Sequence, residues 1–387
     1  MLRLNFILIA IISLPLFLTN LTPVLAESDA PTNQEPYAGE VLCMPDAYLH
    51  TQQDCLALGP SAYLTELAKA GITLPPPPLA AHSPLLEYST LPYEYIKITT
   101  KSAVPIYSSV EDGATGNIAR MMAYGFRYLS ITQRVENEHG IYYQFDTGEW
   151  IWGGDVSRVT PPFFEGFIFR ENPPIPFGWV VENSQTRTSP GHNSAKAGNT
   201  LNRLDVVYIY QEATVGDEVW YLVGPDEWIE GRYIARVNYN PQPPEGVEND
   251  RWIEIDLQQQ VLMVYEQGHI LFATMISTGT PPFYTRPGLH QIYKKLEKGH
   301  MSYADPTDYY YLEDVPWTMY FDKARALHGA YWHSFFGYPR SHGCVNLSIS
   351  DSRWLYEWAN ESDYVYVWDP SGETPTDPNF YKDEGGP

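Results

Sequence analysis

Residues 341–346 read Ser-His-Gly-Cys-Val-Asn, and a second His-Gly step begins at His328, 16 residues before Cys344. A thiol attacks a carbonyl only as a thiolate, so a catalytic cysteine needs an imidazole or a similar positive field that lowers its pKa from about 8.5. His328 and His342 are both candidates for that imidazole. Gly343 allows a tight turn that brings consecutive backbone N–H groups toward one point, where an oxyanion could be held. The pattern predicts a cysteine nucleophile.

The longer stretch 327–347 reads Leu-His-Gly-Ala-Tyr-Trp-His-Ser-Phe-Phe-Gly-Tyr-Pro-Arg-Ser-His-Gly-Cys-Val-Asn-Leu. It resembles, without a gap, the signature of the L,D-transpeptidases with a YkuD-type catalytic domain: a His-Gly step, an intervening loop, then Ser-His-Gly-Cys followed by a hydrophobic residue and Asn or Arg. The resemblance extends over residues 250–368, where the alternation of apolar and polar residues at 251–257 also indicates a strand independently. Arg286 departs from the pattern, because it is inserted between the Thr and Pro of a segment similar to the family's Thr-Pro-x-Gly-x-Phe.

The resemblance also implies the chemistry of the site. Cys344 would attack the carbonyl between the third and fourth residues of a peptidoglycan stem, form a thioester and release the terminal D-amino acid. His328, at the family's spacing, would draw the thiol proton and later deprotonate the acceptor amine. His342 would help to shape the site, and the backbone N–H groups of Gly343 and Cys344 would form the oxyanion hole.

Five further residues are candidates for substrate binding. Ser341 could orient an imidazole and Asn346 could hydrogen-bond the stem, but structural roles in the loop would explain both equally well. Asn346 in place of Arg also leaves the anionic terminus of the donor without the partner that the family offers there. Trp332 and His333 lie in the loop between base and nucleophile, and Tyr320 belongs to an aromatic run that either lines a groove over the stem or belongs to the core.

A zinc site is the alternative for some of the same residues. His328, His333, His342 and Cys344 are all possible ligands. Their spacing follows no common metal pattern, and the family that the chain resembles uses no metal, so no metal or cofactor is expected.

Three functions fit these residues. The first is an exported transpeptidase that cross-links two stems in cell-wall biogenesis and so contributes to cell shape. The second is a carboxypeptidase in which water replaces the acceptor amine. The third is a wall-binding protein with an inactive catalytic domain, which the complete pair of Cys344 and His328 argues against. The expected partners are peptidoglycan stem peptides, with carbapenem-type β-lactams as inhibitors.

The composition of the 387-residue chain sets further limits. A formal net charge of −23 argues against nucleic acid as a partner, because phosphates are bound by Lys and Arg. With 44% hydrophobic and 14% aromatic residues, the chain can bury more than one core and favours many short strands. We therefore expect a mainly β chain: a YkuD-type β-sandwich or barrel with a short helix, preceded by two small SH3-like barrels.

An internal repeat suggests those barrels within residues 93–240. Residues 148–159 align without gaps to residues 226–237, at an offset of 78. Short aromatic strands that end in a Trp-bearing strand and a small turn resemble bacterial SH3-like barrels, so we expect one at 93–160 and a second at 177–240. Either the barrels bind the wall or they are spacers whose tryptophans belong to the core.

The N-terminal part carries signals of export. Residues 1–26 have one Arg, an apolar run and small or apolar residues at the cleavage positions, as an export signal does; an uncleaved membrane anchor is the alternative, but no stable anchor is expected. Export to the cell wall or periplasm would allow Cys43 and Cys55, in the segment 27–92, to pair and leave Cys344 free. Sequence alone does not exclude the other pairings.

Three more segments have recognisable patterns. A short amphipathic helix is predicted at 60–71. A second helix is predicted near 351–359, within the catalytic domain at 250–368, with Ser350 or Asp351 as its N-cap. The tail from 369 to 387 is acidic and rich in Pro and Gly, so we expect it to be flexible.

Overall fold

The computed structural model describes most of the chain from residue 78 onward. The described residues are 78–91, 93–304 and 308–381. The chain forms two compact units, 1–71 and 72–387. The first unit lies outside the described residues, and with it the predicted export signal, the helix predicted at 60–71 and the proposed pair of Cys43 and Cys55. Within the described ranges, no helix is both long and apolar enough to cross a membrane.

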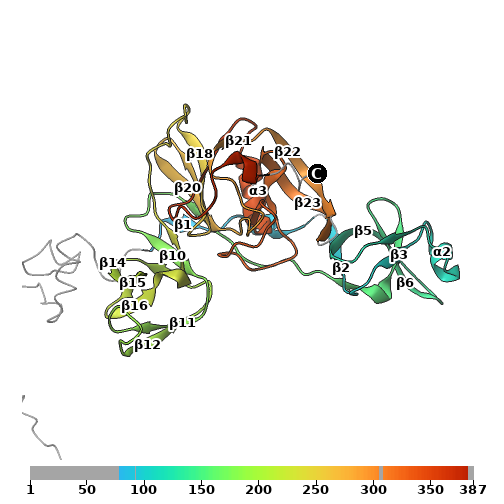
Figure 1. The fold of residues 1–387 in the computed structure, drawn as a ribbon, viewed down its shortest axis with the longest axis horizontal. Coiled ribbons are helices and arrows are strands. Elements are labelled where there is room, and N and C mark those ends of the chain that lie inside the picture. The colour runs from blue at the N-terminus through green and yellow to red at the C-terminus, as the bar shows by residue number, and fades with distance from the viewer. Residues whose placement is uncertain (1–77, 92, 305–307, 382–387) are drawn as a thin grey trace, which may run out of the picture. The chain divides into compact units, whose positions relative to one another are not determined.

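The C-terminal part of the chain, yellow to red in Figure 1, is built on two mixed β-sheets that share a core. One sheet has the order β1 (Ala81–His82), β9 (Phe167–Phe169), β20 (His269–Met275), β19 (Val261–Glu266), β18 (Arg251–Asp256), β26 (Tyr364–Trp368), β21 (Gly288–Gln291). The other has the order β25 (Val345–Leu347), β24 (Arg325–Gly329), β23 (Tyr309–Asp322), β5 (Phe126–Asn137), β2 (Glu94–Ile98), β8 (Val156–Arg158), and β22 (Lys294–Ala304) pairs with β23. Ile253 and Val264 from the first sheet meet Met319 and Leu327 from the second in the core. The expectation of a mainly β fold is confirmed.

The first hairpin of this part has the strands that its alternation predicts. β18 and β19 pair from Arg251 opposite Glu266 to Asp256 opposite Val261. Such alternation normally turns the polar side of a strand toward water, but Glu254 and Asp256 are only 6% and 4% exposed. Burial raises the pKa of Glu254 to about 7 and that of Asp256 to about 6. The polar face of this strand is therefore covered by protein.

The second repeat covers part of the polar face of β18. Its elements are β10 (Phe177–Val180), β11 (Ser184–Arg187), β12 (Lys196–Leu201), β13 (Val206–Tyr208), β14 (Gln211–Val215), β15 (Glu218–Gly224), β16 (Glu227–Glu230), η5 (Gly231–Tyr233) and β17 (Ile234–Val237). Trp179 and Val237 pack against Trp252 and Met263, which lie on the outer face of the first sheet. This repeat is thus in direct contact with the C-terminal part.

The first repeat continues the second sheet. Besides β2, β5 and β8 it contains β3 (Val104–Ile106), α2 (Val110–Thr115), β4 (Arg120–Met122), β6 (Gly140–Phe145), β7 (Trp150–Trp152) and η4 (Gly153–Asp155). β5 pairs in parallel with β23, with Phe126 opposite Tyr310. The ring of Tyr95 stacks on Tyr331 with centroids 3.6 Å apart, and its hydroxyl donates to the Asp314 carbonyl at 2.6 Å. These contacts join the first repeat to the C-terminal part through a shared sheet.

The internal repeat is visible in the order of the elements. The run β6, β7, η4 and β8 corresponds to β15, β16, η5 and β17, and the start of β6 at Gly140 matches the start of β15 at Glu218. The resemblance of each copy to an SH3-like barrel remains a prediction.

The helix predicted near the C-terminus is α3 (Ile349–Trp358), and it buries Leu355 in the core. Its N-cap is Ser348, whose hydroxyl accepts a hydrogen bond from the Asp351 N–H at 3.2 Å. The prediction of a cap at Ser350 or Asp351 was therefore wrong by two or three residues. The helix starts earlier because Ser348 is the residue that keeps extended backbone angles.

Asp351 is not the N-cap of α3 but a completely buried residue that hydrogen-bonds to other elements. Its carboxylate accepts hydrogen bonds from the Gly166 N–H at 3.0 Å and from the Thr274 hydroxyl at 2.6 Å. Burial raises the pKa of Asp351 to about 6, although these hydrogen bonds oppose the shift. Asp351 thereby ties the helix to β20 and to the segment between the two repeats.

The described part of the tail, residues 370–381, is mostly exposed but ends in a buried Tyr381. Tyr381 is 3% exposed, and the guanidinium of Arg325 lies 5.0 Å from the centre of its ring. The Tyr381 carbonyl also accepts a hydrogen bond from Lys323 at 3.5 Å. The flexibility of the tail stays a prediction, and Tyr381 is a buried contact point within its described part.

Candidate active site

Two short parallel strands position the Ser-His-Gly-Cys stretch. β24 and β25 pair with His328 opposite Asn346. Cys344 directly precedes β25 and lies two residues before Asn346. The register therefore puts the predicted nucleophile and the predicted base on neighbouring segments of backbone, although 16 residues separate them in sequence.

The bend before the nucleophile is held from a third segment. Gly343 has φ of +105°, in the region that favours glycine. The Thr285 hydroxyl donates to the Gly343 carbonyl and accepts from the Gly279 N–H, both at 2.9 Å. The segment that carries the unexpected Arg286 thus anchors the nucleophile loop, and the insertion does not disturb that anchor.

Ser341 completes the loop and does not orient an imidazole, contrary to one of the predictions. Its hydroxyl donates to the Cys344 carbonyl and accepts from the Gly343 N–H at 3.0 Å. The N–H of Gly343, predicted to serve an oxyanion hole, is therefore already used inside the loop. An oxyanion can take this donor only if the Ser341 hydroxyl gives it up.

Cys344 is a free thiol, partly buried against aromatic side chains that include Tyr310 and Tyr320. Its Sγ lies 3.8 Å from the Ala324 carbonyl oxygen. Burial raises the pKa of the Cys344 thiol, and a backbone N–H and the guanidinium of Arg325 offset this only in part. The sequence predicts a lowered thiol pKa, whereas burial acts in the opposite direction on Cys344 in the resting site.

His328 is 1% exposed, and its ring lies 5.6 Å from the ring of Trp332. Nδ1 lies 3.2 Å from the Gly329 carbonyl oxygen, an acceptor, so Nδ1 carries the proton and Nε2 keeps its lone pair. Burial lowers the pKa of His328 to about 4, which keeps the imidazole neutral. Among the described residues no hydrogen bond joins His328 to Cys344, so the two groups are neutral neighbours and not a preformed ion pair.

His333 and Asn346 form a second polar pair beside the base. His333 Nε2 lies 2.9 Å from Asn346 Nδ2, while His333 Nδ1 accepts from the Phe335 N–H at 3.2 Å. A neutral imidazole cannot accept at both nitrogens, so the Asn346 amide is better turned with its oxygen toward His333. In either orientation one buried amide atom of Asn346 lacks a partner; as drawn it is Oδ1. That atom is buried and leaves the amide of Asn346 partly unsatisfied.

His342 is engaged elsewhere. Its Nε2 lies 2.6 Å from an Asp308 carboxylate oxygen, and its ring lies 4.5 Å from Phe283 and 4.9 Å from Tyr310. A carboxylate partner keeps a proton on Nε2 and so prevents this nitrogen from taking the thiol proton. Each of the two candidate imidazoles therefore keeps one nitrogen that can accept a proton, Nε2 in His328 and Nδ1 in His342.

Tyr320 belongs to the core, which is one of the two positions that the sequence left open for it. It is 1% exposed, and its hydroxyl is a buried group without a hydrogen-bond partner among the described residues. Burial raises its pKa, and the neighbouring Cys344 adds to the rise. Tyr320 therefore belongs to the cluster of aromatic side chains against which Cys344 packs.

Arg325 is a site residue that sequence reasoning missed. It is 8% exposed, donates to the Tyr284 carbonyl at 3.0 Å and pairs with Asp322 at 3.2 Å. A Cβ on Gly343 would lie 3.1 Å from its Nε, so the guanidinium lies directly behind the nucleophile loop. No local motif marks Arg325, because only the pairing of β24 with β25 brings it there.

A cleft of about 680 Å³ lies where the first repeat meets the loop between base and nucleophile. The loop contributes Trp332, His333, Arg340 and His342, and the first repeat contributes Lys97, Phe126, Tyr128 and Arg158. Lys97, Arg158 and Arg340 are positive, and no Asp or Glu lines the cleft. In a chain of net charge −23, this makes the cleft a local site for anions.

The zinc alternative finds no support in the geometry. In the described part of the chain, one group of His, Cys, Asp and Glu brings three ligand atoms within 4.8 Å of one another, and it lies in the second repeat. His328, His333, His342 and Cys344 do not form such a group.

Comparison with known proteins agrees with this site. Residues 250–367 match the family model of the YkuD L,D-transpeptidase catalytic domain. The C-terminal part of the chain is therefore a YkuD-type catalytic domain, and the resemblance seen in the sequence is confirmed over this range. A search of curated proteins gives no match.

Several solved structures are similar in part. One is the catalytic domain of an Enterococcus faecium L,D-transpeptidase, with 25% identity over 32% of this chain and 100% of that one, at a TM-score of 0.29. A Stackebrandtia nassauensis L,D-transpeptidase has 28% identity over 34% of this chain and 60% of its own, at a TM-score of 0.28. A Mycobacterium smegmatis L,D-transpeptidase has 16% identity over 54% of this chain and 93% of its own, at a TM-score of 0.30. The assignment rests on the family match and not on these likenesses.

Proposed function

We propose that this protein is an L,D-transpeptidase that cross-links peptidoglycan, with Cys344 as nucleophile and His328 as base. The observation that supports the proposal is the register of β24 and β25 within a YkuD-type domain, which puts His328 and Cys344 on adjacent segments of backbone.

In the first half-reaction the sulfur of Cys344 attacks the carbonyl between the third and fourth residues of the donor stem. The thiol proton passes to Nε2 of His328 as the C–S bond forms, so the ionic form is made only when it is needed. The C–N bond then breaks, and the leaving amine of the terminal D-residue takes that proton. The products are a thioester on Cys344 and a free D-amino acid.

In the second half-reaction the amine of a second stem attacks the thioester carbonyl. Nε2 of His328 accepts a proton from this amine and returns it to the departing sulfur, which restores the thiol. The new bond is an amide between two stems. Water in place of the amine would give a carboxypeptidase, which shares every residue of the first step.

We propose that the cleft, which Trp332 and His342 line but Cys344 and His328 do not, receives the part of a stem peptide beyond the reacting carbonyl. Such peptides carry carboxylates, and Lys97 and Arg340 offer them positive partners, whereas Arg158 already pairs with Glu94 at 3.0 Å. Arg325 adds a cation behind the nucleophile loop and compensates for the absence of Arg at the Asn346 position. In this proposal the first repeat is a wall of the substrate site, which goes beyond both predicted roles of wall binding and spacing.

The proposed function also predicts where in the cell the protein acts and which compounds inhibit it. L,D-transpeptidases act on the cell wall, so we expect the chain to be exported to the wall or periplasm by the signal at 1–26. One Enterococcus faecium structure is described as acylated by ertapenem. We expect carbapenems to acylate Cys344 in the same way.

The test is incubation of the purified chain with disaccharide tetrapeptides, followed by mass spectrometry. Cross-linked dimers support the transpeptidase, and tripeptides without dimers point to the carboxypeptidase. Cys344→Ala should lose both products and the carbapenem adduct, whereas His192→Ala, in the second repeat, should keep them. Absence of both products and of the adduct in the wild type would indicate the wall-binding protein with an inactive domain.

A further inference from the structure

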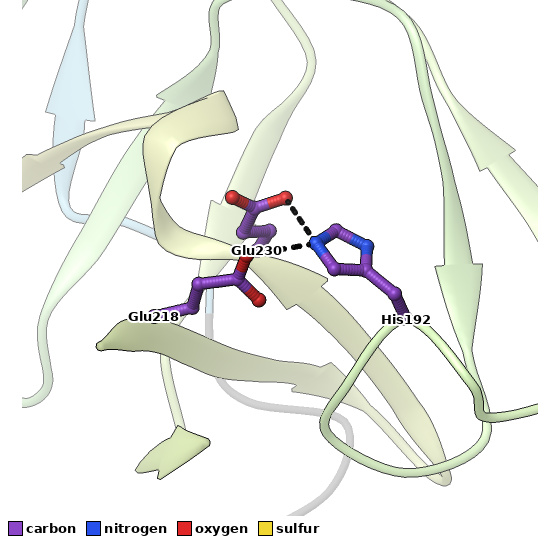
Figure 2. Close-up of side chains that lie close together, drawn as sticks. All are labelled: His192, Glu218 and Glu230. Carbon is purple, nitrogen blue, oxygen red and sulfur yellow. Dashed lines mark hydrogen bonds and ion pairs between the residues drawn. The ribbon is translucent and has the colours of Figure 1, made fainter. Parts of the chain in front are cut away.

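The second repeat contains a cluster of three possible metal ligands far along the chain from the catalytic residues. His192 lies in the loop between β11 and β12, Glu218 begins β15 and Glu230 ends β16. Figure 2 shows the three side chains directed toward one another. His192 Nε2 lies 3.0 Å from Glu218 Oε1 and 3.7 Å from Glu230 Oε2.

The buried carboxylate of Glu230 has one oxygen without a hydrogen-bond partner. Glu230 is 7% exposed; its Oε1 pairs with Nε of Arg232 at 2.8 Å, but Oε2 has no hydrogen bond among the described residues. A proton on His192 Nε2 can be donated to Glu218 at 3.0 Å, yet 3.7 Å is too long for a second bond to Glu230. An unpartnered buried carboxylate oxygen is costly, so it points to a missing cation.

The first repeat shows that the sheet does not need these acids. Tyr142 faces Trp152 across β6 and β7 just as Trp220 faces Glu230 across β15 and β16. At the repeat offset of 78, Gly140 and Trp152 therefore stand where the second repeat has Glu218 and Glu230. The Trp152 indole covers Gly140, since a Cβ there would lie 3.0 Å from the indole nitrogen.

Two carboxylates on one face of neighbouring strands repel each other unless a positive group lies between them. Glu218 precedes Trp220 by two residues, so the strand alternation puts it on the same face as Trp220 and its partner Glu230. His192 supplies only one proton to the pair. A divalent cation would contact all three residues at once.

We propose that His192, Glu218 and Glu230 bind a divalent transition metal, with Zn²⁺ as the best fit. The edges of a tetrahedral zinc site with bonds of about 2.0–2.1 Å are about 3.3 Å long, between the two measured separations. One imidazole and two carboxylates suit Zn²⁺, Mn²⁺ or Ni²⁺, whereas Mg²⁺ and Ca²⁺ prefer oxygen alone. The metal links the 188–195 loop to β15 and β16, and so fixes the second repeat. The sequence analysis expects no metal in this protein, and the proposal departs from that expectation.

The test is calorimetric titration of the full chain with Zn²⁺. Wild type should bind one equivalent of Zn²⁺ more than His192→Ala binds. The affinity of this extra site for Zn²⁺ should be at least tenfold higher than that of any site left in the variant. The same site should bind Zn²⁺ at least a hundredfold more tightly than Mg²⁺. Since His192 is half exposed, the variant should fold, and circular dichroism without metal checks this. Glu218→Gln, at a partly exposed position, should also lose the site.

His139→Ala is the matched control. His139 lies 3.6 Å from Glu138 in the first repeat but belongs to no cluster of three ligands. It should bind Zn²⁺ as wild type does, and Zn²⁺ should raise the melting temperature of wild type and His139→Ala but not of His192→Ala. Equal Zn²⁺ stoichiometry and affinity in wild type and His192→Ala, or preference for Mg²⁺, would overturn the proposal. Because no step depends on peptide transfer, this outcome is independent of the proposed enzymatic function.

Discussion

The resting protonation of the nucleophile can be tested by alkylation of Cys344 with iodoacetamide across a range of pH. Burial raises the pKa of this thiol above its ordinary value of 9.0, and burial lowers the pKa of His328 to about 4. At pH 7 the Cys344 thiol is then mostly protonated, because burial disfavours the thiolate. The structure therefore predicts that Cys344 reacts slowly with an alkylating reagent when no substrate is bound.

The expected rate of alkylation rises about tenfold per pH unit, or about a hundredfold between pH 6 and pH 8, without a plateau. The His328→Ala variant should show nearly the same profile, because a neutral imidazole does not stabilise the resting thiolate. The same variant should lose transfer of the stem peptide, because there the imidazole must accept the proton. Mass spectrometry of the peptide that contains Cys344 measures the rate, and Cys344→Ala gives the background.

A plateau below pH 7, or a large loss of alkylation in His328→Ala, would refute this reasoning. Either result would mean that a thiolate and an imidazolium already coexist at rest, as the sequence alone suggests. Circular dichroism across the same range of pH checks that unfolding does not expose the thiol.

Three other predictions concern the cleft and the buried acids. Lys97→Glu should raise KM for the stem peptide about fivefold, from the loss of about 1 kcal/mol of attraction, whereas Lys101→Glu, exposed and outside the cleft, should leave KM nearly unchanged in steady-state kinetics. Asp351→Ala should lower the free energy of unfolding by roughly 3 kcal/mol in urea titrations, because it leaves the buried Gly166 N–H without an acceptor; a loss below 1 kcal/mol would contradict this role. Glu254 has a pKa of about 7 when folded against an ordinary 4.5, so the free energy of unfolding should fall as pH rises from about 4.5 to about 7, by up to roughly 3 kcal/mol from this group. Glu254→Gln should flatten that fall, and an unchanged slope would show that another group causes it.

Much of the catalytic domain could be predicted because its signals are local. The spacing of His328 and Cys344, the alternation along β18 and the pattern that gives α3 each depend on residues close in sequence, where backbone periodicity and turn chemistry act directly. The N-cap was misplaced by two or three residues because Ser348, Ser350 and Asp351 are all good caps and only the backbone angles choose among them.

The state of the site itself depends on contacts between distant segments. Whether Cys344 is ionised depends on the aromatic side chains that exclude water from it, and these come from β23 and the loop before β25. The role of Ser341 depends on a bend that Thr285 holds from another segment. A motif of a few residues records neither burial nor these partners.

The sequence by itself determined that this chain carries a Cys344–His328 pair in a YkuD-type domain, preceded by a duplicated β-rich unit. Only the tertiary structure decided that Cys344 is partly buried, which raises the pKa of its thiol, that Lys97 of the first repeat lines the same cleft as the catalytic loop, and that His192 meets Glu218 and Glu230. The physical reason is the distance along the chain over which each effect acts. Spacing and periodicity are properties of residues close in sequence, whereas desolvation and charge pairing depend on which surfaces the folded chain brings together.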